Sequence, residues 1–187
     1  EENDAEGDQL TSIENLIGSS FADVLMGDSK ANQIDGGAAS DELHGRDGND
    51  TLIGDDGFDL LVGGDNNDRM TGGDGGDTFS WEAGPIVGVD AITDFKTGSL
   101  GDVLDVSDLL VGFNSDTSNA NDFVRFLVGA ANTTVQVDVN GAVGGSDFVN
   151  LVTLTGVTGA GGAGGGLPAS PTAQATRESG RTNAKKP

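Results

Sequence analysis

Residues 18–80 decide the fold. In blocks of nine they read GSSFADVLM, GDSKANQID, GGAASDELH, GRDGNDTLI, GDDGFDLLV, GGDNNDRMT and GGDGGDTFS. We number the positions within each block as columns one to nine. Column one is always glycine, column six is aspartate except at Asn32, and column eight is always large and apolar. Three columns that stay in register over seven blocks indicate a tandem repeat of one structural unit.

Each block is expected to form one turn and one short strand. The glycines permit positive φ in the turn, and columns seven to nine are long enough for a strand of roughly 10 Å. Two blocks complete one coil, so alternate column-eight residues should stack in two facing rows. The sequence therefore predicts an all-β fold, a flattened right-handed parallel β-roll. Its rows are Leu25, Leu43, Leu61 and Phe79 on one sheet, and Ile34, Leu52 and Met70 on the other.

Such a roll needs cations. The chain has a formal net charge of −22 and no cysteine, so disulfides cannot stabilise it. Adjacent coils lie about 4.8 Å apart. At that distance two stacked carboxylates repel by about 3.5 kcal/mol at an effective dielectric near 20. Without a counter-ion the roll is not expected to fold.

Calcium suits the ligands that these turns offer. It takes six to eight oxygen ligands and mixes carboxylates with backbone carbonyls. Because one coil is two blocks, each ion should lie between block n and block n+2, which gives three to five ions. The first pair on each side should be weak, since Asn32 lacks a charge and Phe21 replaces a flexible column-four residue. The pairs are Asp23/Asp41, Asp41/Asp59, Asp59/Asp77, Asn32/Asp50 and Asp50/Asp68.

The predicted site residues are column-six aspartates, acidic column-three residues and the glycines around them. They are Asp23, Asp41, Gly45, Asp47, Gly48, Asp50, Gly54, Asp56, Gly57, Asp59, Gly63, Gly64, Asp65, Asp68, Gly72, Gly73, Asp74, Gly75 and Asp77.

This nonapeptide resembles the haemolysin-type calcium-binding repeat of the repeats-in-toxin (RTX) family, and the resemblance implies a calcium-stacked parallel β-roll. A second resemblance follows the repeats. Asp77–Phe79, Asp90–Phe95 and Gly101–Leu110 are similar to the target region of proteins exported by type I secretion. In that region a further calcium often lies near a segment equivalent to residues 90–95, which here implies Asp90 or Asp94 as a ligand.

The chain divides into four parts. Residues 1–9 are expected to be an acidic linker, 10–80 the calcium-binding roll with a lead-in turn at 10–17, 81–157 a small β-rich cap, and 158–187 a disordered tail. Within the cap, strands are predicted at 123–128, at 135–139 before an Asn140-Gly141 hairpin turn, and at 148–154. Trp81 should cover the end of the core.

Composition argues against catalysis within this chain. With one histidine, His44, and no cysteine there is no HExxH zinc motif and no cysteine-ligated metal site. No serine in an elbow motif accompanies His44. A chain with this much negative charge should repel nucleic acid and anionic lipid. Any catalytic domain, and any contact with a membrane or host surface, would therefore lie upstream of Glu1.

The RTX resemblance implies a module at the C-terminus of a larger secreted protein of a Gram-negative-type bacterium. Such a module stays unfolded in the low-calcium cytosol, passes a type I exporter, and folds outside. The alternatives are the ancillary domain of a secreted enzyme or pore-forming toxin, or the tail of a large surface adhesin. The family's apolar terminal stretch is missing here, so poor export is expected when this chain alone is the cargo.

Overall fold

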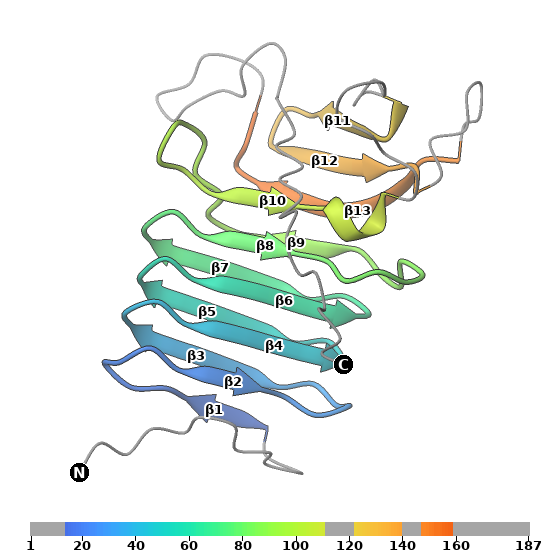
Figure 1. The fold of residues 1–187 in the computed structure, drawn as a ribbon. Helices are drawn as coiled ribbons and strands as arrows, with labels where there is room; N and C mark the ends of the chain where they lie inside the picture. Colours follow the sequence, from blue (N-terminus) through green and yellow to red (C-terminus); the bar gives the residue numbers. More distant parts are fainter. Residues whose placement is uncertain (1–13, 111–121, 140–146, 159–187) are drawn as a thin grey trace, which may run out of the picture.

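The computed structural model describes residues 14–110, 122–139 and 147–158. Across these ranges the chain consists of β-strands and one short 3-10 helix, with no α-helix, which confirms the all-β class. Parallel coils stack upward in Figure 1, from β1 (Asn15–Ile17) at the bottom to a small antiparallel layer at the top. None of the helices in the described ranges is long and apolar enough to cross a membrane.

The repeats form two parallel sheets in which each strand pairs with the strand two positions along the chain. One sheet contains β1, β3, β5 and β7, and the other contains β2, β4, β6 and β8. The middle strands have six residues rather than the three expected, because columns two and three also pair across coils. The bounds are β2 (Val24–Met26), β3 (Gln33–Ala38), β4 (Glu42–Asp47), β5 (Thr51–Asp56), β6 (Leu60–Asp65), β7 (Arg69–Asp74) and β8 (Thr78–Ser80).

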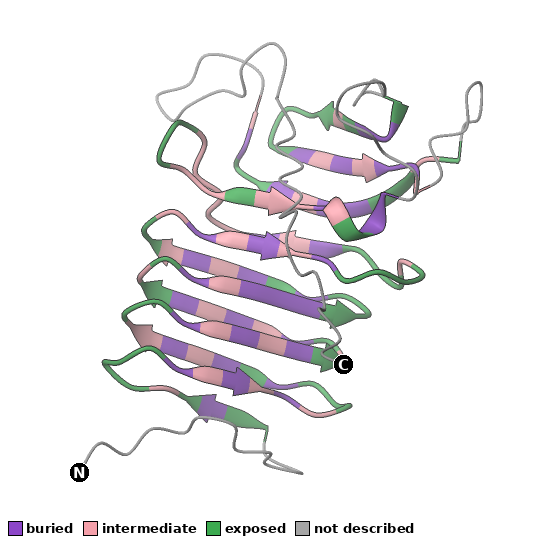
Figure 2. Ribbon diagram, viewed as in Figure 1, coloured by how far each residue is buried: buried purple, intermediate pink, exposed green. Residues whose placement is uncertain are grey.

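The column-eight side chains form the core in two facing rows, as the period predicts. Register pairs Ile34 with Leu52 and Leu52 with Met70 in one sheet, and Leu43 with Leu61 in the other. Each of these side chains is fully buried, and Figure 2 shows the resulting alternation of buried and partly exposed positions along the strands. Burying one such side chain contributes roughly 1.5–3 kcal/mol.

The two sheets do not end at residue 80, where the sequence analysis placed the end of the roll. β9 (Asp90–Ile92) pairs in parallel with β7 and sets Ile92 beside Met70. β10 (Val103–Asp105) pairs with β8 and sets Leu104 beside Phe79. An Asp-x-apolar triplet thus starts another layer on each sheet after a longer turn. At the opposite end Leu16 pairs with Ile34, which confirms its predicted place in the apolar row. Residues 10–13 of the predicted lead-in turn lie outside the described residues.

The C-terminal strands extend the first sheet. After the 3-10 helix η1 (Ser107–Leu109) come β11 (Val124–Val128), β12 (Asn132–Val137) and β13 (Val149–Thr155). The predicted strands at 123–128 and 148–154 are confirmed to within one residue, whereas the middle strand begins three residues earlier than predicted and ends at 137 instead of 139. They pair antiparallel with one another, and β13 pairs in parallel with β9. Trp81 is buried, as expected. The linker 1–9, the Asn140-Gly141 turn and residues 159–187 of the tail lie outside the described residues.

Candidate metal centre

The turns between the strands gather along two edges of the roll. Turns 18–23, 36–41, 54–59 and 72–77 form what we call the Asp77 edge, and turns 27–32, 45–50 and 63–68 form the Asp68 edge. Parallel pairing places each turn directly over the equivalent turn one coil below, as in the pairing of Asp55 with Gly73. The stacking of block n on block n+2 is therefore present in the structure.

Column six forms a hydrogen-bonded ladder along each edge. The backbone N–H of each column-six residue from Asp23 to Asp59 donates to Oδ1 of the aspartate eighteen residues later, one coil above. On the Asp77 edge the donor–acceptor distances are 2.8 Å for Asp23 to Asp41, 2.9 Å for Asp41 to Asp59 and 3.1 Å for Asp59 to Asp77. On the Asp68 edge they are 2.7 Å for Asn32 to Asp50 and 2.8 Å for Asp50 to Asp68.

The second oxygen of these aspartates has no hydrogen-bond partner. Native proteins rarely leave a buried polar atom unpaired, and an unpaired buried charge is still more costly. Stacked one above another, these atoms form two rows of negative charge inside the turns. Five such carboxylate oxygens are buried, namely Oδ2 of Asp41, Asp50, Asp59, Asp68 and Asp77.

Burial raises the pKa of these carboxyl groups, because the charged form is poorly solvated inside the turns. Desolvation raises the pKa of Asp68 from 3.8 to about 7, and those of Asp50 and Asp59 to about 6. Neighbouring aspartates along the edge push each pKa further in the same direction. The ladder N–H groups oppose the rise but do not cancel it. A cation beside these oxygens would reverse the effect by stabilising the charged form.

The column-one glycines leave the space that the unpaired oxygens face. A Cβ added at Gly54 would lie 2.3 Å from Oδ2 of Asp59 and 2.5 Å from the carbonyl oxygen of Gly72 in the next coil. At Gly45 it would lie 2.4 Å from Oδ2 of Asp50. Any side chain in column one would therefore fill the space beside the carboxylate. This explains why the column contains glycine alone.

The turns fall into two conformational groups. From residue 36 onward the column-two residue is left-handed, with φ of 98° at Gly37, 69° at Asp55 and 97° at Gly73. The first turn on each edge lacks this conformation. There the column-two N–H donates a hydrogen bond to the column-six side chain of the same turn. Ser19 N–H donates to Oδ2 of Asp23 at 2.6 Å, and Asp28 N–H donates to Oδ1 of Asn32 at 2.8 Å.

The acidic column-three residues lie on the outside of the turns. Asp47 pairs in register with Asp65, and Asp56 with Asp74, and all four are exposed. They add negative charge around the edges rather than to the buried rows. Within the described ranges no three acidic or histidine side chains converge as a metal cluster. An ion at these edges must therefore take most of its ligands from backbone carbonyls, which an oxygen-seeking cation such as calcium accepts.

Comparison with known proteins agrees with this donor set. The model of the RTX calcium-binding nonapeptide repeat matches residues 17–52 and 44–79, the stretch that forms both edges. The chain carries RTX calcium-binding repeats. No curated protein sequence matches it.

Two solved structures are similar to the chain. The AlgE6R3 subunit of the Azotobacter vinelandii mannuronan C5-epimerase is 28% identical, with 75% of this chain and 74% of that chain covered and a TM-score of 0.40. The AlgE6R2 subunit of the same enzyme is 27% identical, with 75% and 83% covered and a TM-score of 0.40.

Two further column-six equivalents lie beyond the RTX repeats. Asp68 N–H donates to Oδ1 of Asp90, and Asp77 N–H donates to Oδ1 of Asp102, both at 3.0 Å. The spacings are 22 and 25 residues instead of 18, so the nine-residue period does not reveal them. The signal that could have done so is the Asp-x-apolar triplet itself, in Asp90-Ala91-Ile92 and Asp102-Val103-Leu104.

In the segment expected to hold a cap calcium, the carboxylates of Asp90 and Asp94 already accept hydrogen bonds from the protein. Asp90 accepts the N–H of Asp68 and, at 2.8 Å, the indole N–H of Trp81. Asp94 accepts the backbone N–H groups of Gly72 at 3.0 Å and Gly73 at 2.8 Å. All four carboxylate oxygens are therefore bonded within the protein, unlike the five buried Oδ2 atoms of the repeat aspartates.

Proposed function

We propose that this RTX roll is a calcium-dependent folding switch in a secreted protein. The supporting observation is the pair of stacked rows of buried, unpartnered carboxylate oxygens that end at Asp77 and at Asp68. Without cations these rows oppose the packing of one coil on the next. With cations each coil can be added to the one before it.

The proposed sites lie between successive turns on one edge. Their side-chain ligands are Asp41 with Asp59 and Asp59 with Asp77 on one edge, and Asp50 with Asp68 on the other, while the glycine-rich turns provide carbonyl oxygens. Bound calcium supplies the positive charge that the buried rows lack. The first pair on each edge should bind more weakly, because Ser19 and Asp28 already donate to its lower member.

The setting that suits such a switch is export. Calcium sites of extracellular modules bind at about 10⁻⁴–10⁻³ M, so a roll of this kind stays unfolded where free calcium is low and folds where it is millimolar. We propose that the chain is part of a larger protein that leaves a bacterium through a type I exporter and folds outside. The hydrogen-bonded ladder of column-six residues then forms only after export.

The switch is tested by titrating the chelated protein with calcium. Far-UV circular dichroism and the fluorescence of Trp81, the one tryptophan, should change together and cooperatively, because several ions bind only to the folded state. Magnesium at equal concentration should not replace calcium, because it demands tighter octahedral geometry and loses water reluctantly. A protein that keeps its full β-structure in chelator would refute the switch.

A further inference from the structure

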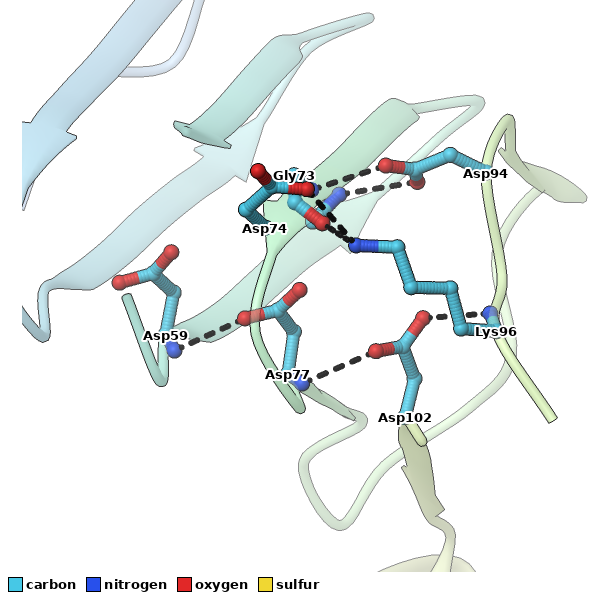
Figure 3. A network of polar contacts seen from close by, with 8 residues as sticks. Asp59, Gly73, Asp74, Asp77, Asp94, Lys96 and Asp102 are labelled. Atoms are coloured by element: carbon cyan, nitrogen blue, oxygen red, sulfur yellow. Dashed lines mark hydrogen bonds and ion pairs between the residues drawn. The ribbon is translucent and has the colours of Figure 1, made fainter. Parts of the chain in front are cut away.

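Lys96 lies at the end of the Asp77 edge, beside the last turn of the repeats. Its ammonium group donates to the carbonyl oxygen of Gly73 and lies 3.5 Å from Oδ1 of Asp74. Figure 3 shows the side chain reaching across from the segment that also contains Asp94. A shallow cavity of about 300 Å³ surrounds it, lined by Gly73 and by Asp55, Asp56, Asp74 and Asp94. One ammonium group thus lies among four aspartates.

The carbonyl that Lys96 contacts belongs to a series. Where the upper turn has glycine in column two, the column-two carbonyl of the turn below lies against it. Thus the carbonyl oxygen of Arg46 lies against Gly64, and that of Asp55 lies against Gly73. Gly73 is the column-two residue of the last repeat turn on the Asp77 edge, so its carbonyl faces the segment 94–102 above. The ammonium group of Lys96 contacts the Gly73 carbonyl on the side where, one coil below, the carbonyl of Asp55 meets the turn above it.

Asp102 closes the same gap from the other side. Its Oδ1 continues the N–H ladder from Asp77, but its Oδ2 accepts the backbone N–H of Lys96 at 2.7 Å. The last layer on the Asp68 edge is closed in a similar way, where Trp81 donates to Oδ2 of Asp90. The row of unpartnered oxygens therefore stops at the last repeat on each edge.

From this geometry we propose that the ammonium group of Lys96 is a built-in cation that occupies the position above turn 72–77 in place of calcium. It neutralises the last gap on the Asp77 edge and ends the stack of ions there. This inference rests on the proposed calcium sites below it. It adds that calcium is confined to the five gaps between repeat turns, and that the layer of β10 docks without an ion.

The first test is to count calcium ions per chain after dialysis against millimolar free calcium, by elemental analysis. The wild-type protein should bind no more than the five ions that the repeat gaps allow. Lys96→Ala removes both the charge and the bulk, which leaves the Gly73 carbonyl and the carboxylate of Asp74 beside an open position that Asp55 and Asp56 also line. This variant should bind one calcium more than the wild-type protein. Lys96→Met fills the position without a charge, so it should bind no extra ion and should melt at a lower temperature in calcium.

Arg69→Ala is the matched control, because Arg69 is an exposed basic residue on β7, outside the repeat turns, and should leave the ion count unchanged. A wild-type count above five, an unchanged count in Lys96→Ala, or a Lys96→Ala protein that stays unfolded at every calcium concentration would each overturn the proposal. A wild-type chain that binds no calcium would instead refute the proposed function, so the two failures are distinguishable.

Discussion

The backbone N–H of Asp41 donates to Oδ1 of Asp59 at 2.9 Å, across one coil of the roll. Oδ2 of Asp59 is buried without a hydrogen-bond partner. One carboxylate therefore has two separable roles, in which one oxygen ties the coils together and the other is left for a cation. A substitution that keeps the first role and removes the charge tests the second.

Asp59→Asn should raise the calcium concentration at the folding midpoint by about tenfold, because losing one charged ligand costs on the order of 1.4 kcal/mol or more. Asp50→Asn should act similarly, since it too is shared by two proposed sites. Asp23→Asn should shift the midpoint far less, because its Oδ2 already accepts the N–H of Ser19. Circular dichroism during a calcium titration measures all three, and equal shifts would contradict the pairing of block n with block n+2.

Gly54→Ala should destabilise the calcium-loaded roll by about 1–3 kcal/mol, as overpacking does. The added methyl group would collide with Oδ2 of Asp59 and with the carbonyl of Gly72. Gly84→Ala is the control, since no atom lies within 4 Å of the corresponding position. Urea unfolding in saturating calcium measures both, and a neutral Gly54→Ala would show that the space beside the carboxylate is not needed.

Ile92→Ala should destabilise the folded protein by about 2–5 kcal/mol, because this fully buried side chain joins the core row of the repeats to the C-terminal strands. Leu100→Ala is the matched control, because Leu100 is 90% exposed and should change stability by no more than about 0.5 kcal/mol. Thermal unfolding in calcium distinguishes them. Comparable losses for the two variants would mean that β9 is not part of the continuous core.

Removing residues 159–187 should leave the calcium midpoint and melting temperature unchanged. This segment contains no alternating or helical apolar pattern, and Val157 is the last buried residue described before it, its carbonyl accepting the hydroxyl of Thr133 at 2.8 Å. Melting curves of the truncated and full chains in calcium measure this. A substantial fall in the melting temperature would show that the tail contributes to folding.

The sequence by itself determined the roll from Leu16 to Phe79. Glycine, aspartate and an apolar residue recur at fixed columns, and a period of nine with two blocks per coil allows only one stacking of Leu43 on Leu61 or of Leu52 on Met70. The same arithmetic placed Asp41 beneath Asp59 and predicted where cations are needed. These features are local and repeated, so each block favours the same structure.

Only the tertiary structure decided how the stack ends. Asp90 and Asp102 join the ladder after turns of irregular length, so the nine-residue period does not predict them. The position of Lys96 depends on how the segment 94–102 folds back over Gly73, which is a long-range arrangement that no local pattern specifies. The closed turns at Ser19 and Asp28 were likewise invisible, because they differ from the later turns in backbone conformation. An interior coil packs against an equivalent repeat on both sides, so the repeat sequence specifies its contacts. The last coil packs against β9 and β10, whose sequences do not follow the repeat.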